Sequence, residues 1–172
     1  MWKTTVCGVA IVLEMRSLTV KIFIVAVVLA ALITPVLAFE PKMPGPRDRC
    51  PVCGMFVAPY PEWIATIVLE NGEQVFFDGA KDMFRYYFAL PEGQVTRDNI
   101  RAIYVTEYYS ARYAPVDEVL FVLGSEVYGP MGAELIPVRG RRHAETFMKD
   151  YSGNRIVVFD EVTPELLPPD HR

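Results

Sequence analysis

Several residue types that carry familiar chemistry are scarce in this chain. Its 172 residues include only 3 cysteines and 2 histidines. The sequence has neither a phosphate-binding glycine loop nor a nucleophile-elbow serine with a histidine nearby in sequence. The carboxylates form no pair suited to general acid and base catalysis. Nothing in the sequence asks for an enzyme, and we expect none.

Positive charge is also in short supply. Lysine and arginine number 17 against 21 aspartates and glutamates, which gives a formal net charge of −4 at pH 7. A protein that binds nucleic acid needs basic patches to meet the phosphates. We therefore expect no nucleic-acid partner.

Long hydrophobic runs are missing as well, and the longest one is Ile22–Ile33. It is shorter than the roughly 20 apolar residues that cross a bilayer as a helix. Arg16 and Lys21 precede it, and the small residue Ala38 follows at the expected cleavage point, which is the order of a secretory signal. We expect a signal peptide over residues 1–38 and a periplasmic or extracytoplasmic protein.

Two further expectations concern this N-terminal region. An uncleaved N-terminal membrane anchor is the alternative to cleavage. Residues 1–14 precede a signal that is already complete from Met15, so we interpret them as the product of a start assigned too early.

Export would leave a mature chain whose composition changes along its length. Residues 39–49 are rich in proline and have no apolar period, which predicts a tether. Residues 50–163 have the patterning of one globular domain, and the proline-rich residues 164–172 are expected to form a loose tail.

The domain itself alternates short strands with two helices. Asn71-Gly72 predicts a hairpin turn between the first two strands, and Asp78 is the expected N-cap of the first helix. A Gly-Pro-Met-Gly loop is expected over 129–132. The predicted strands span 63–69, 74–77, 100–109, 119–123, 135–138 and 155–159, and the predicted helices span 80–88 and 141–151. This order indicates an α+β domain with helices packed on antiparallel sheet, in two similar halves.

The mature chain keeps two cysteines, Cys50 and Cys53, in a Cys-Pro-Val-Cys stretch. They could form a structural bridge in an interaction module, which an oxidising compartment favours. They could also exchange thiols and disulfides, but Pro59 and Pro61 block the following helix that would lower a thiol pKa. A four-thiolate zinc or iron site needs a second cysteine pair, which only a homodimer joined through these cysteines could supply.

Binding of a soft metal fits these residues better. Thiolate and thioether sulfur favour Cu(I) over harder cations. Met55 and Met131 lie in glycine-rich segments, where a packing role is not expected, so both are candidate ligands beside Cys50 and Cys53. Met83 and Met148 fall on apolar helix faces and are expected to fill the core. His143 is expected to be solvated.

Three segments in combination resemble the NosL family. They are the run from Arg49 through Cys50 to Met55, the segment Phe76–Phe84, and Gly129–Gly132 continuing through Pro137. The resemblance extends to Val162 and so covers most of the mature chain.

The resemblance implies an exported Cu(I)-binding accessory protein that delivers copper for the assembly of nitrous oxide reductase. It also implies a fold of two related α+β halves. The implied partner is an apo-cuproenzyme, a membrane transporter or an assembly complex. Cys53 and Met131 match the family's sulfur ligands, whereas Ala133 stands where the family pattern Met-Gly-His has its histidine. Cys50 or Met55 would then complete the site.

Overall fold

The computed structural model describes residues 41–90 and 95–169. The predicted signal peptide and the predicted early start therefore lie outside the described residues. Within the residues that are described, no helix is long and apolar enough to span a membrane.

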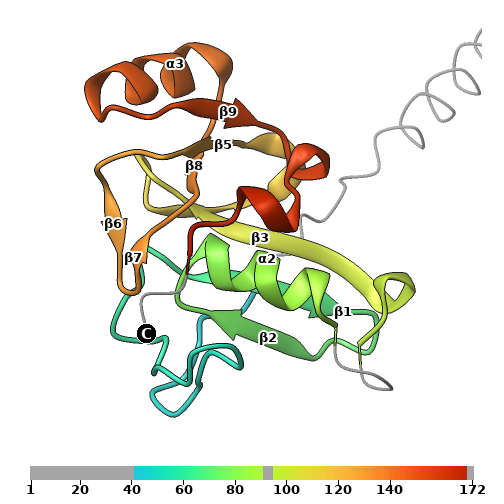
Figure 1. The fold of residues 1–172 in the computed structure, drawn as a ribbon. Helices are drawn as coiled ribbons and strands as arrows, with labels where there is room; N and C mark the ends of the chain where they lie inside the picture. Colours follow the sequence, from blue (N-terminus) through green and yellow to red (C-terminus); the bar gives the residue numbers. More distant parts are fainter. Residues whose placement is uncertain (1–40, 91–94, 170–172) are drawn as a thin grey trace, which may run out of the picture. The chain divides into compact units, whose positions relative to one another are not determined.

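A four-stranded antiparallel sheet forms the first half of the domain (Figure 1). Its strand order is β2-β1-β3-β4, and the strands are β1 Ala65–Leu69, β2 Gln74–Phe77, β3 Ile100–Glu107 and β4 Arg112–Pro115. The predicted hairpin is confirmed, because β1 pairs with β2 from Ala65 opposite Phe77 to Val68 opposite Gln74. Strand β1 is buried along its whole length, as expected for a β-branched central strand.

Helix α2, Ala80–Phe88, follows β2 directly and packs on this sheet. The predicted helix boundaries are confirmed. Met83 and Phe84 are fully buried at helical spacing, and Phe84 makes an edge contact with Phe121 of the second half, with ring centroids 5.1 Å apart.

The second half repeats the arrangement with fewer strands. Its three-stranded antiparallel sheet has the order β8-β5-β9, from β5 Leu120–Leu123, β8 Ile136–Val138 and β9 Arg155–Val157. Helix α3, Arg141–Asp150, covers it with Ala144 and Phe147 buried. The predicted face of this helix is confirmed, since Met148 and Tyr151 pack against the same cluster.

The two halves share a core. One buried cluster joins Ile67, Phe77 and Phe84 of the first half to Phe121 and Leu135 of the second. The backbone continues the connection, because the Tyr108 N–H after β3 donates to the Pro137 carbonyl of β8 at 2.9 Å. These observations confirm the α+β class and the two related halves.

Three details differ from the sequence-based expectation. The segment 129–132 is a small hairpin, formed by β6 Tyr128–Gly129 and β7 Gly132–Ala133, because the Pro130-Met131 turn lets its flanks pair. Strand β4 was not predicted. The tail expected to be loose from Pro164 onward begins with a short 3-10 helix, η4 Pro164–Leu166, and Leu166 and Leu167 pack against the core. Three further 3-10 helices are η1 Arg97–Asn99, η2 Val116–Glu118 and η3 Phe159–Glu161.

Candidate metal site

The Cys-Pro-Val-Cys stretch forms the tip of a tight turn. Arg49 and Phe56 form an antiparallel bridge at its base. Inside the bridge, the Cys50 N–H donates to the Met55 carbonyl and the Gly54 N–H donates to the Cys50 carbonyl, both at 2.9 Å. Gly54 has φ of 80°, a left-handed conformation that favours glycine. The turn aims both thiols inward without a helix starting at either cysteine.

Asp78, which lies just before α2, and Asp82, in the first turn of α2, supply two carboxylates to these thiols. The Cys50 Sγ–H donates to Asp82 Oδ2 at 3.4 Å, and the Cys53 Sγ–H donates to Asp78 Oδ1 at 3.2 Å. One ligand atom from each of these four residues lies within 4.8 Å of the others, so the group could hold a metal ion. Two thiols and two carboxylates from separate segments therefore form one candidate site.

The prediction that Asp78 caps α2 is wrong. The N-cap is Gly79, whose backbone is extended at φ of −179°, and no side chain of the N-cap position bonds to the helix. Asp78 is instead 1% exposed and accepts from Cys53, because the tight turn brings the thiol to it. Its side chain belongs to the candidate site.

The site is buried and rich in negative charge. Burial, reinforced by the Asp78 carboxylate, raises the pKa of the Cys50 thiol far above its ordinary value. Burial raises the pKa of Cys53 to about 12, and Asp78 adds to that shift. Burial and the charge of Asp78 also raise the pKa of Asp82. Without a cation, the site therefore keeps protons on its sulfurs.

Such an arrangement suits cation binding better than thiol attack. Both cysteines are free thiols. A reactive cysteine needs a lowered pKa, and here both thiol pKa values are raised. A bound cation would replace the two thiol protons and compensate the negative charge of the thiolates.

Of the predicted ligands, the structure brings Cys50 and Cys53 together. Met131 lies in the turn between β6 and β7, and its carbonyl accepts a hydrogen bond from Lys81 Nζ of α2 at 2.7 Å. Met55 is half-buried and contacts Cys50 through its own carbonyl. As ligands, Met131 and Met55 stay predictions. Ala133 lies in β7, half-buried and opposite Tyr128.

The other residues considered from the sequence behave as expected. Met83 is fully buried in the core, and Met148 packs against the α3 cluster. His143 is exposed, and its Nδ1 lies 3.1 Å from the Arg139 carbonyl oxygen.

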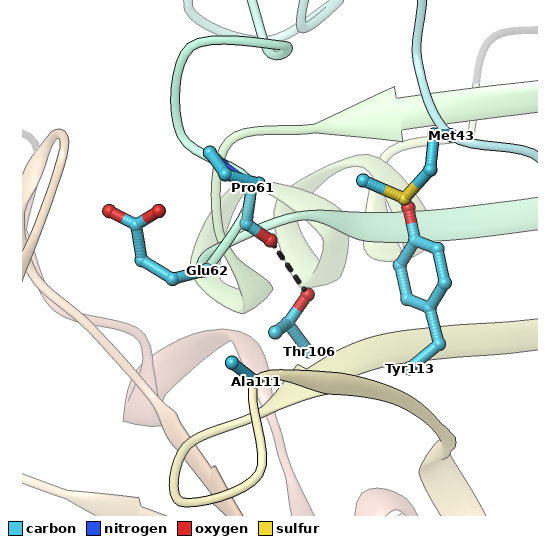
Figure 2. Close-up of a pocket in the computed structure, with 6 residues that line it drawn as sticks. All are labelled: Met43, Pro61, Glu62, Thr106, Ala111 and Tyr113. Carbon is cyan, nitrogen blue, oxygen red and sulfur yellow. Dashed lines mark hydrogen bonds between the residues drawn. The ribbon is translucent and has the colours of Figure 1, made fainter.

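Two pockets lie apart from the thiols. Figure 2 shows the smaller one, about 380 Å³, where Met43 and Tyr113 stand opposite Pro61 and the Thr106 hydroxyl donates to the Pro61 carbonyl at 3.3 Å. The larger pocket, about 820 Å³, lies beside α3 and is lined by Glu107, Tyr109, Ser110, Arg139, Gly140, His143, Thr146 and Asp150. Neither contains a cysteine.

Sequence reasoning missed Asp82 and the site role of Asp78. A signal was present in the sequence Asp78-Gly79-Ala80-Lys81-Asp82, where three charged residues begin an apolar helix. Lys81 and Asp82 are buried although most residues of these types are exposed, which marks the head of α2 as unusual.

Fold and site together define an α+β protein of two related halves with a buried candidate metal site of two thiols and two carboxylates. The chain belongs to the NosL family, whose model matches residues 41–167.

A solved structure agrees with this fold. The crystal structure of the copper chaperone NosL from Shewanella denitrificans aligns with a TM-score of 0.60 and 21% identity, over 77% of this chain and 99% of that one. The solution structure of the apo-NosL protein from Achromobacter cycloclastes aligns with a TM-score of 0.43 and 25% identity, over 60% of this chain and 87% of that one. No curated protein matches the chain.

Proposed function

We propose that this chain is an exported Cu(I)-binding accessory protein that holds copper for delivery to a cuproenzyme. The observation that carries the proposal is that the free thiols of Cys50 and Cys53 lie within one group of potential metal-ligand atoms. Membership of the NosL family and the fold shared with a protein described as a copper chaperone support the same role.

The proposed ligands are the Cys50 and Cys53 thiolates with the Met131 thioether, and Met55 as a further sulfur. Cu(I) accepts thiolate and thioether ligands readily. Ala133 offers no ligand atom, so in this proposal a cysteine or methionine sulfur replaces the histidine imidazole of the family pattern. Asp78 and Asp82 stand next to the two sulfurs and orient them, as residues behind metal ligands commonly do.

Transfer would begin at Cys53. Its side chain is half-buried, whereas Cys50 is 1% exposed. An incoming ligand from a partner protein therefore reaches the copper from the Cys53 side and displaces that sulfur first. The exchange requires no catalytic residue and no change in the oxidation state of copper, and each released thiolate takes up one proton.

The receiving partner in this proposal is nitrous oxide reductase, another cuproenzyme, or the membrane transporter or assembly complex that serves it. The location is periplasmic or extracytoplasmic, as the signal-like N-terminus predicts. An excess of acidic residues suits docking on a basic partner surface.

Two alternatives have less support. Thiol-disulfide exchange would need an activated thiolate, whereas burial raises the pKa of both thiols. An interaction module held by a Cys50–Cys53 bridge would need a disulfide, whereas both cysteines are free here.

The test is an anaerobic Cu(I) titration of the reduced mature domain against a competing chelator. Cys53→Ser and Met131→Ala should both weaken copper binding. Met43→Ala is the matched control, because Met43 is 59% exposed in the predicted tether and should leave the affinity unchanged. Parent-like affinity in both site variants would show that the site is wrong.

A further inference from the structure

Two buried polar side chains connect the Met131 hairpin to helix α2, which carries the site carboxylate Asp82. Lys81 is 1% exposed and Glu134 is 4% exposed. Neither belongs to the group of potential metal ligands. An apolar side chain could fill the same space in the core. Burying such groups is costly unless they are hydrogen-bonded.

Glu134 makes the first connection. Its Oε1 accepts from the Lys81 backbone N–H, and also from the Leu135 N–H at 2.9 Å. The carboxyl group therefore satisfies one of the N–H groups that every helix leaves free in its first turn. Gly79 makes room for it, since a Cβ there would lie 2.1 Å from Glu134 Oε2.

Lys81 makes the second connection in the opposite direction. Its Nζ donates to the Met131 carbonyl oxygen at 2.7 Å. The next residue, Asp82, accepts from the Cys50 thiol. The side chain of Lys81 thus contacts the Met131 hairpin, and the side chain of the next residue, Asp82, contacts the cysteine turn.

We propose that Lys81 and Glu134 are positioning residues that hold the Met131 hairpin against the beginning of α2, so that the Met131 sulfur can reach copper bound by the thiols. This inference rests on the proposed function and adds a cause for it. The strands of this hairpin contain only two residues each, so strand pairing alone is too short to fix the position of the Met131 thioether. The hydrogen bonds of Lys81 and Glu134 supply the further contacts that hold the hairpin in place.

The test is a double-mutant cycle on Cu(I) affinity, measured by chelator competition, with Lys81→Leu and Met131→Ala. Leucine removes the donor and brings no sulfur that could bind copper. We expect Lys81→Leu to weaken Cu(I) binding by about 10- to 100-fold, the range typical for residues behind metal ligands. In the Met131→Ala background the same substitution should have almost no further effect, because the group that it positions is gone.

Controls separate positioning from stability. Lys149→Leu makes the same chemical change on the exposed side of α3 and should leave copper affinity unchanged. Thermal unfolding of each variant without copper measures the structural cost. A residue with a merely structural role would lower the melting temperature and leave the affinity of the folded protein alone.

The outcomes are distinguishable. If Met131→Ala binds copper like the parent, Met131 is not a ligand and the positioning inference is overturned, whereas copper binding by the thiols is tested separately with Cys53→Ser. If Met131→Ala weakens binding and Lys81→Leu does not, or if the two losses simply add, the positioning inference is overturned. Gly79→Ala provides an independent variant, because the nearest atoms that the added Cβ would meet are those of the Glu134 carboxyl group. It should reproduce the affinity loss and the same coupling to Met131, and parent-like affinity there would also overturn the inference.

Discussion

The beginnings of the two helices differ although both helices follow a strand of an antiparallel sheet. Each helix starts after a glycine N-cap whose position provides no side-chain hydrogen bond, and each packs on an antiparallel sheet. In α2 the first residues, Ala80 to Asp82, are buried. In α3 the first residues, Arg141 to His143, are exposed.

This difference distinguishes the helix start beside the candidate metal site from the helix start that is exposed to solvent. At α3, the first residues are exposed to solvent, so their N–H groups and cationic side chains need no partner within the protein. At α2, the Lys81 N–H donates to Glu134 and the Lys81 side chain donates to the Met131 carbonyl. The Asp82 carboxylate accepts from the Cys50 thiol. The same arrangement of strand and helix thus occurs once exposed to solvent and once beside the candidate metal site.

The largest effect that can test this comparison is on stability. Phe84 in α2 and Phe147 in α3 are both fully buried. Replacing either with alanine should cost about 3–5 kcal/mol in the free energy of unfolding, from lost burial and the cavity left behind. Urea denaturation of the copper-free protein measures this cost. The folded Phe147→Ala protein should bind Cu(I) like the parent, and a matching loss of affinity would contradict the separation of roles.

The next effect is the dependence of copper affinity on pH. Because the pKa of Cys53 is about 12 and that of Cys50 is also raised, both thiols carry protons at neutral pH. Binding as two thiolates releases two protons, so affinity should fall by about 100-fold for each unit that the pH is lowered.

The single variant Cys53→Ser provides the internal control for this slope. It should reduce the dependence to about tenfold per pH unit, since only one thiol remains to lose a proton. Competition titrations at several pH values between neutral and mildly alkaline measure both slopes. An affinity that does not change with pH would mean that the cysteines are not the ligands.

A smaller effect is expected at Asp78. Its carboxylate accepts from Cys53 and raises the pKa of that thiol. Asp78→Asn removes the negative charge at nearly constant shape, so the pKa of Cys53 should fall. Alkylation of Cys53 as a function of pH measures it, and Asp150→Asn on the exposed side of α3 is the matched control. An unchanged or higher pKa of Cys53 would show that the carboxylate does not act on the thiol.

The smallest effect should come from the beginning of α3. Arg142 is exposed, and Arg142→Ala should change the free energy of unfolding by no more than about 0.5 kcal/mol. Copper affinity should stay at the parent value. A large loss of either would mean that the exposed helix start has a role that its surroundings do not suggest.

Local patterns were sufficient for much of the fold. The β1–β2 hairpin and both helices followed from an Asn-Gly turn and from apolar residues at helical spacing, which depend on neighbours in sequence. Strand β4 was missed because Arg112–Pro115 is short, ends in proline and pairs only at the edge of the sheet.

The site was predictable only in part, for a related reason. The cysteine pair is visible because its two members are three positions apart. Its carboxylate partners Asp78 and Asp82 come 25 and 32 positions later than the cysteines that they accept from. Their contact depends on a tight turn meeting the start of a helix. The contacts of Lys81 with Glu134 and with the Met131 carbonyl join the two halves of the domain, and no local sequence pattern predicts them.

The most direct test of the central claim is X-ray absorption spectroscopy at the copper edge on the Cu(I)-loaded mature domain. We predict a copper environment dominated by sulfur, with short thiolate bonds from Cys50 and Cys53 and no imidazole contribution. Cys53→Ser should lose one of these sulfur contributions, while Met43→Ala should match the parent. A spectrum without sulfur neighbours, or one that Cys53→Ser leaves unchanged, would contradict the account.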